Sequence, residues 1–125
     1  MRYSLLVLVS PEQSALAVHA LRFSQALLMA EHRIDCVFFQ DAGVLTGLSG
    51  CEAAQDELDL RDEWTHFAAT DSGKLILCSA SAARYGLLAE EGERLLSGFT
   101  IGGLGELVAA EARSDRTLVF GGRAR

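Results

Sequence analysis

Short apolar runs recur along the chain and are separated by segments with a different period. Residues 3–9, 34–39, 74–77 and 116–120 are each of strand length and are rich in Leu, Val, Ile and Phe. They do not alternate strictly between apolar and polar positions, as a strand with one wet face does. Such strands are typical of parallel sheets that are covered on both faces. The pattern predicts a mostly parallel sheet of four or five strands.

The segment after the first run has helical periodicity. Leu16, Ala20, Phe23 and Leu27 recur at spacings of four, three and four residues, which places them on one stripe of a helix. We expect this stripe to face the sheet. A strand, a helix and a second strand in this order form a right-handed βαβ unit.

A second helical pattern covers residues 56–70. Leu60, Trp64 and Phe67 predict its buried face, whereas Arg61 and the acidic residues around it predict the face in contact with water. This helix leads into the third apolar run, so the order of strand, helix and strand is repeated.

Two other segments lack a clear period. Residues 40–55 predict a long loop with a helical turn near Val44, and residues 87–98 predict a second irregular segment. Thr100 is positioned to cap a helix that runs through residues 102–110. The predicted elements alternate between strand and helix, which is typical of a three-layer α/β/α fold.

We expect the whole chain, residues 1–125, to form one domain of flavodoxin-like architecture. No apolar run reaches the roughly 18 residues of a membrane-spanning helix, so we expect no membrane contact. The three cysteines are an odd number and lie far apart, which disfavours a disulfide framework and agrees with a reducing, cytoplasmic location. The formal net charge of −6 disfavours direct tight binding to nucleic acid.

The sequence changes character at Cys78, where an apolar strand ends and a short helix, residues 79–85, is expected to begin. Open α/β sheets place their chemistry at such points, because backbone N–H groups are free there and the helix dipole favours negative charge. Cys78 is therefore the leading candidate for a nucleophilic thiolate, and the alternative is a small buried hydrophobic residue. The groups expected to stabilise the thiolate belong to Ser79, Ala80 and Ser81, through their backbone amides, and to Arg84.

The remaining residues with reactive side chains have weaker cases. Cys36 lies inside the second strand and is expected to be an inert core residue. Cys51 lies in the long loop, where it is either incidental or a resolving thiol. His19, His32 and His66 are expected to be surface or packing residues. The spacing of Cys, His and carboxylate residues matches no metal site, so we expect neither a metal nor another cofactor.

Five groups of residues form a pattern whose order and spacing are fairly specific. They are Phe23 to Leu28, Val37-Phe38-Phe39 with Gly43-Val44, Asp59-Leu60 with Trp64, Leu77-Cys78 with Ala80, Ala83, Arg84 and Gly86, and Gly98-Phe99-Thr100 with Gly103-Leu104-Gly105. Together they resemble the DsrE family of small sulfurtransferases, and most of all its TusD-like sulfur-relay subunits. The resemblance runs nearly from end to end, although Glu31 stands where the family commonly has glycine.

That resemblance implies an activity and a set of partners. In the family, the cysteine that matches Cys78 carries a persulfide, which implies that Cys78 receives a sulfane sulfur from a donor carrier protein and passes it to the next carrier. The implied pathway is the 2-thiolation of the tRNA wobble uridine. The implied assembly is a hetero-oligomer with related small subunits, TusB-like and TusC-like, or a homo-oligomer. No cofactor is implied.

Three alternatives stay open on the sequence alone. Other DsrE proteins are associated with sulfur trafficking during the oxidation of reduced sulfur compounds, and the residues do not separate that pathway from tRNA thiolation. A different class is a non-catalytic module that binds an anion at the strand ends, in which Cys78 is structural. The third is an architectural subunit that has kept the fold and lost the chemistry.

Overall fold

The computed structural model describes residues 1–12, 15–48, 59–70, 74–86 and 95–122 of the chain. The expected order of strands and helices is present, with one additional strand at Phe99–Gly102. The strands are β1 (Arg2–Val7), β2 (Arg33–Phe39), β3 (Lys74–Cys78), β4 (Phe99–Gly102) and β5 (Arg116–Phe120). The helices are α1 (Ala15–Met29), the 3-10 helix η1 (Asp41–Gly47), α2 (Leu60–Thr70), α3 (Ser79–Arg84) and α4 (Leu104–Arg113).

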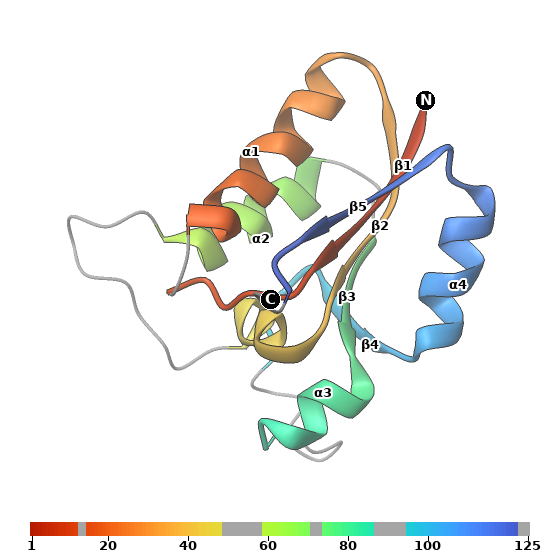
Figure 1. Ribbon diagram of the computed structural model, residues 1–125. Helices are drawn as coiled ribbons and strands as arrows, with labels where there is room; N and C mark the ends of the chain where they lie inside the picture. The colour runs from red at the N-terminus through yellow and green to blue at the C-terminus, as the bar shows by residue number, and fades with distance from the viewer. Residues whose placement is uncertain (13–14, 49–58, 71–73, 87–94, 123–125) are drawn as a thin grey trace.

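The strands form one sheet in the order β4-β3-β2-β1-β5, and each neighbouring pair is parallel. Helices α1 and α2 lie on one side of this sheet and α4 lies on the other (Figure 1). Helices η1 and α3 lie beyond the carboxyl ends of the strands, far from the N-terminus. The predicted three-layer α/β/α fold with a mostly parallel sheet is confirmed.

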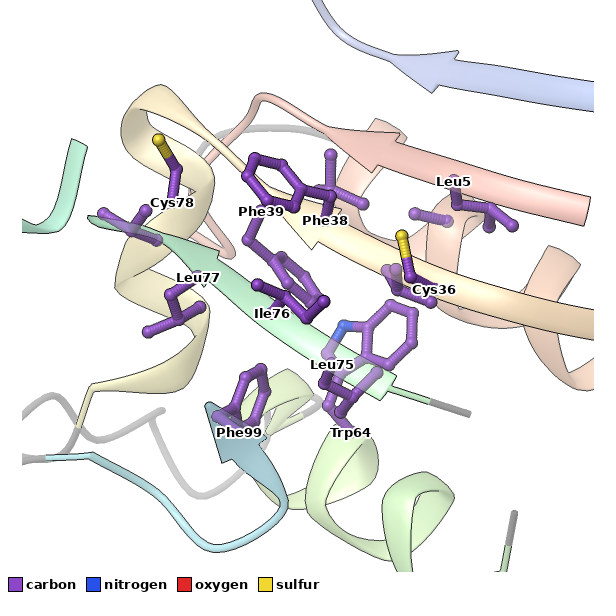
Figure 2. Close-up of a cluster of buried hydrophobic side chains, with 14 of the residues drawn as sticks. Leu5, Cys36, Phe38, Phe39, Trp64, Leu75, Ile76, Leu77, Cys78 and Phe99 are labelled. Atoms are coloured by element: carbon purple, nitrogen blue, oxygen red, sulfur yellow. The ribbon is translucent and has the colours of Figure 1, made fainter. Parts of the chain in front are cut away.

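The face of the sheet under α1 and α2 holds a cluster of aromatic rings. The ring of Phe39 lies 5.4 Å from that of Trp64 and 5.5 Å from that of Phe99, measured between centroids. Trp64 lies 5.4 Å from Phe67, and all four side chains are buried (Figure 2). Leu60 is buried as well, so the buried stripe predicted for α2 is confirmed.

Alternate residues of the strands point to the opposite face, toward α4. Figure 2 shows the sulfur atoms of Cys36 and Cys78 on the side of the sheet away from Trp64. Ile76 shares this side, because it lines a small cavity together with Cys36 and residues of α4. Residues two apart in a strand point the same way. The side chain of Cys78 therefore lies on the α4 face of the sheet.

The structure corrects the predicted start of the last helix. Thr100 caps no helix, because it lies in β4 and pairs with Ile76 of β3. Helix α4 begins at Leu104, and Gly103 is its N-cap residue. The open edge of β3 offers unpaired backbone groups to β4. A ladder satisfies the backbone of that segment better than a helix whose first turns are rich in glycine.

The apolar stripe predicted for α1 is only partly correct. Ala20 and Leu27 are buried, but Leu16 is 40% exposed and Phe23 is 37% exposed. Small side chains let the helix lie close to the sheet, and the hydroxyl of Ser24 is satisfied by the Ala20 carbonyl at 2.8 Å. The buried face of α1 consists of Ala17, Ala20, Leu21, Ser24 and Leu27.

Arg61 is buried, although the periodicity of α2 predicted that it faces water. Its Nε donates a hydrogen bond to the Leu45 carbonyl at 3.0 Å, and its Nη2 lies 2.6 Å from a carboxylate oxygen of Glu12. Both partners come from segments outside α2, which the periodicity of one helix does not reveal. Arg61 thus ties α2 to η1 and to the segment that follows β1.

The remaining loop predictions divide into two groups. The helical turn expected near Val44 is confirmed by η1. The prediction for Cys51, and the greater part of the predicted irregular segment at residues 87–98, lie outside the described residues.

Candidate functional site

Cys78 occupies the junction that the sequence predicted. It is the last residue of β3 and the N-cap residue of α3, with φ −61° and ψ 122°. The first backbone N–H groups of any α-helix have no partner within that helix. The Cys78 side chain makes no capping hydrogen bond with them. The thiol therefore stands next to N–H donors that a developing negative charge can use.

The neighbouring strands end beside this cysteine. Leu77 pairs with Phe39, the last residue of β2, and Cys78 pairs with Gly102, the last residue of β4. Cys78 is 3% exposed. The candidate site is thus at the carboxyl end of the sheet, one strand in from the edge strand β4.

Ser81 and Arg84 both form hydrogen bonds with Asp41. The backbone N–H of Asp41, at the start of η1, donates to the Ser81 hydroxyl oxygen at 2.9 Å. Arg84 Nη2 donates to the same oxygen at 3.1 Å and to Asp41 Oδ1 at 3.0 Å. Asp41 has a φ of 52°, a left-handed conformation that these contacts help to hold. This Asp41–Ser81–Arg84 clamp fixes α3 against η1.

The other predicted groups have different surroundings. Ser79 and Ala80 are exposed at the start of α3, so their backbone N–H groups are the parts that can act on Cys78. Within the described segments, neither Ser81 nor Arg84 hydrogen-bonds to Cys78. The charge of Arg84 is directed to Asp41.

Helix η1 packs very closely on the strand ends. A Cβ atom at Gly43 would collide with the carbonyl oxygen of Val7, the last residue of β1. A Cβ atom at Gly47 would lie 2.8 Å from side-chain carbons of Leu77 and Phe99. Both positions therefore require glycine for close approach. The backbone of η1 is thus held close to the ends of β1 and β3.

Glu106 is a neighbour of the site that the sequence interpretation missed. A Cβ atom at Gly102, the residue paired with Cys78, would collide with the Glu106 carboxylate and would lie 2.9 Å from Ile76 Cγ2. The carboxylate therefore lies on the same face of the sheet as Cys78, beside the residue that pairs with it. The available signal was weak: an acidic residue in the first turn of a helix, which usually serves the helix dipole.

Cys36 has the opposite character. It is 1% exposed, and burial raises the pKa of its thiol to about 11, although a hydrogen bond with Ser4 lowers it. A thiol with that pKa is almost wholly protonated at neutral pH. The prediction that Cys36 belongs to the core is confirmed.

Among the described residues, neither the contacts of His32 and His66 nor a metal site belongs to the candidate site. His32 Nδ1 lies 3.1 Å from the Met1 amine, and His66 is exposed and lies 3.6 Å from an Asp62 carboxylate oxygen. Within the described part of the chain, no group of three His, Cys, Asp or Glu side chains is arranged to hold a metal ion. No helix among the same residues is long and apolar enough to cross a bilayer.

Comparison with protein families gives one match across this fold. The DsrE/DsrF-like family matches residues 1–120. A sulfurtransferase TusD homolog of Pseudomonas aeruginosa is 36% identical over 125 residues, which cover 94% of this chain and 95% of that protein. The sulfurtransferase TusD of Sodalis glossinidius is 38% identical over 112 residues, which cover 83% of this chain and 86% of that one.

Two solved structures share the architecture. The ychN protein from E. coli has a TM-score of 0.78 at 23% sequence identity, and the match covers 96% of this chain and all of that one (100%). The protein MTH1491 from Methanobacterium thermoautotrophicum, described as of unknown function, has a TM-score of 0.69 at 18% identity, covering 94% and 97%. At these identities the two structures support the fold alone.

Proposed function

Because this chain belongs to the DsrE/DsrF-like family, we propose that it is a sulfurtransferase that works as one subunit of a sulfur relay. Cys78 is the sulfur-carrying residue in this proposal. It accepts a sulfane sulfur as a persulfide and passes it to the next carrier protein. The observation that carries the proposal is the position of Cys78, at the end of β3 and directly before α3, in a chain matched over residues 1–120 by this family.

The proposed reaction is a thiol–persulfide exchange. The Cys78 thiolate attacks the outer sulfur of a donor protein's persulfide, and the donor's S–S bond breaks as the new S–S bond forms. The donor cysteine leaves as a thiolate and takes up a proton. In the second half, an acceptor thiolate attacks the outer sulfur on Cys78 and restores the Cys78 thiolate. Sulfur is transferred without any net oxidation, so no further reactant is needed.

The local geometry supports this role in two ways. Free N–H groups at the start of α3 can stabilise the thiolate and the persulfide anion, both of which carry negative charge. The Asp41–Ser81–Arg84 clamp holds α3, and with it the backbone around Cys78, in a fixed position. At 3% exposure, the thiol reaches a partner's sulfur only when neighbouring groups are displaced, which makes partner docking part of the transfer.

The pathway and partners are also part of this proposal. The relatives' name, sulfurtransferase TusD, supports a relay between carrier proteins, and we infer 2-thiolation of the tRNA wobble uridine as its end point. The partners are then a donor carrier, an acceptor carrier and related small subunits, TusB-like and TusC-like, in a hetero-oligomer. A homo-oligomer is the alternative assembly. A cytoplasmic location, where thiols stay reduced, suits an exchange that needs a free thiolate.

Intact-mass spectrometry tests the proposal directly. The purified protein is incubated with glutathione persulfide, and Cys78→Ser and Cys36→Ser variants are treated in parallel. We expect one added sulfur on the wild type and on Cys36→Ser, and none on Cys78→Ser. Peptide mapping then assigns the added sulfur to a residue.

One alternative has a specific observation in its favour. The low exposure of Cys78 also fits an architectural subunit in which this cysteine only fills space. In that case wild type and Cys78→Ser gain sulfur equally or not at all, and relay activity survives the substitution. Either result removes Cys78 from the mechanism.

A further inference from the structure

A basic cleft lies at the amino end of the sheet, opposite to Cys78. Its volume is about 430 Å³, and its charged lining includes Arg2, Arg33, Lys74 and Arg113. These are four of the eleven Lys and Arg residues in a chain whose net charge is −6. Lys74 and Cys78 are the first and last residues of β3, which places them about 13 Å apart along the strand. The cleft is therefore separate from the proposed sulfur site.

Three of the four cations in this cleft form no ion pair with the described part of the chain. The one lining carboxylate is Asp35, and both of its oxygens already accept hydrogen bonds, from Arg2 at 2.7 Å and from Ser114 at 3.1 Å. Among the described residues, Arg33, Lys74 and Arg113 have no ion-pair partner. The lining thus carries a formal charge of +3, from four cations and one carboxylate, with His32 taken as neutral.

Helix ends at this edge account for only part of that excess. Helices α1 and α4 contribute Leu28 and Arg113, near their C-termini, to the lining of the cleft, and each C-terminus carries about half a negative charge. They offset about one of the three positive charges, which leaves about +2, close in size to the charge of about −1.5 to −2 on a phosphate monoester. A further donor is free, because Arg2 Nε is buried and lacks a hydrogen-bond partner.

The cleft also has an apolar wall and more room than a phosphate ion needs. Leu28, at the end of α1, and Ile34, in β2, line it together with the ring of His32. A concave site of this size with a few convergent polar groups is typical of small-molecule binding. The acidic character of the rest of the chain disfavours a long polyanion, which needs an extended basic surface.

We propose that this cleft binds a small organic phosphate. The phosphate lies against Arg33, Lys74 and Arg113, and the organic part lies along Leu28 and Ile34. Inorganic phosphate shares the charged contacts but not the apolar ones, so it binds more weakly. The proposal does not depend on the sulfur chemistry of Cys78.

The sequence provides a sharp probe, because Lys74 is the only lysine in the chain. Pyridoxal 5′-phosphate carries a phosphate and an aldehyde, and the aldehyde condenses with a lysine amine to an imine that borohydride reduces. We expect it to label Lys74 at concentrations at which pyridoxal, which lacks the phosphate, does not. Peptide mass spectrometry separates Lys74 from the N-terminal amine. Equal labelling of Lys74 by the two reagents overturns the proposal.

Competition identifies the kind of anion. Adenosine monophosphate should protect Lys74 at a concentration at least about tenfold lower than inorganic phosphate, because it also contacts the apolar wall. Equal protection by both overturns the organic-phosphate assignment. Protection by RNA alone, with none by adenosine monophosphate, overturns the small-molecule assignment.

Charge variants provide the matched control. Arg33→Gln and Arg113→Gln should each weaken binding of adenosine monophosphate about tenfold in equilibrium dialysis, since a charge-assisted hydrogen bond contributes on the order of 1.4 kcal/mol or more. Arg22→Gln removes an exposed cation on α1 whose partner is Gln25 and which does not line the cleft, so binding should be unchanged. Cys78→Ser should also bind normally. Equal weakening in Arg22→Gln overturns the proposal in favour of a non-specific charge effect.

Discussion

Cys36 and Cys78 are both buried, at 1% and 3% exposure, but Cys36 lies in the middle of β2 whereas Cys78 lies at the carboxyl end of β3. Cys36 pairs with Ser4 of β1 and with Lys74 of β3, so its backbone belongs to the ladder on both sides. Cys78 ends its strand, so the residues that follow it have N–H groups with no ladder partner. The position of the cysteine along its strand, and not the exposure of its side chain, therefore distinguishes the candidate nucleophile from the inert thiol.

The two ends of the sheet also differ in how they are held together. At the amino end, a polar network joins Arg2, Asp35, Ser114 and Ser4, with the two serine hydroxyl oxygens 2.6 Å apart. At the carboxyl end, η1 lies so close to β1 that Gly43 has no room for a side chain. Charge and hydrogen bonds fix the first end, and close backbone packing fixes the second. Four measurements test this contrast.

Alkylation should show the largest difference. With a pKa of about 11, Cys36 is a thiolate in about one molecule in a thousand at pH 8, so in the folded protein it should react at least about 100 times more slowly than in the unfolded chain. Cys78 should react faster than Cys36 but more slowly than in the unfolded chain, because its thiol is only 3% exposed yet lies at a strand end, next to the first N–H groups of α3. Timed labelling with iodoacetamide and peptide mass spectrometry measure both rates. Equal labelling of Cys36 in native protein and in protein unfolded by urea contradicts the contrast.

A side chain at Gly43 should damage the carboxyl end more than any change at an open glycine. Gly43→Ala forces η1 away from the Val7 carbonyl, and we expect it to lower the free energy of unfolding by about 2–3 kcal/mol. Gly105→Ala is the matched control, because a Cβ atom there meets nothing within 4 Å and alanine favours helix. Urea unfolding of both variants measures the two changes in the free energy of unfolding. A similar loss of stability in both would falsify the close-packing argument.

Removing the charge of Asp35 at the amino end should lower the stability less than Gly43→Ala does, and the loss should depend on pH. Burial opposes the charged form of Asp35, but hydrogen bonds from Arg2 and Ser114 and the charges of Arg2 and Arg113 outweigh it, so the pKa of Asp35 is lowered. A lowered pKa in the folded state stabilises the protein above the ordinary value of 3.8, and this contribution is lost as the pH falls through the lower folded value.

Asp35→Asn should therefore cost about 1.5 kcal/mol at pH 7, the lower end of the range for a hydrogen bond to a charged group, because Arg2 is partly exposed. The loss should shrink toward zero in acid. Asp62→Asn is the control, because Asp62 is exposed and should change stability little. Urea unfolding at pH 7 and in acid measures the difference. A loss for Asp35→Asn that does not depend on pH rules out the charge explanation.

The smallest effect is expected at Glu31, where the backbone is left-handed with φ 66°. Asp41, at the other end, has the same kind of conformation but is held by Arg84. Glu31→Gly should raise the free energy of unfolding by about 0.5–1 kcal/mol, because glycine adopts this conformation without a steric penalty. Glu31→Ala retains the strain and should show no gain. Equal gains in the two variants point to the charge of Glu31 instead of its backbone.

Much of the fold followed from local pattern. Apolar strand-length runs predicted a parallel sheet, and the change of character after Leu77 predicted the end of β3 at Cys78. Both are confirmed, because the pattern of apolar residues within one short segment is enough to indicate a strand and its end. The glycine expected at Glu31 in this family corresponds to a real left-handed position.

Contacts between distant segments could not be predicted in this way. Thr100 entered a strand because β3 offered it an open edge, and Arg61 was buried because Leu45 and Glu12 supplied partners. Arg84 was expected beside Cys78, but η1 brought Asp41 to it instead. Periodicity describes one element at a time, whereas these partners come from others.

The sequence by itself determined the residue at the end of β3 and the order of the strands and helices apart from β4. Only the tertiary structure decided which face of the sheet Cys78 points to and which carboxylate lies near it. It also gathered Arg33, Lys74 and Arg113 from β2, β3 and α4 into one cleft. The reason is physical: a sheet aligns the ends of strands that are far apart in the chain, and charge acts across the resulting distances in space.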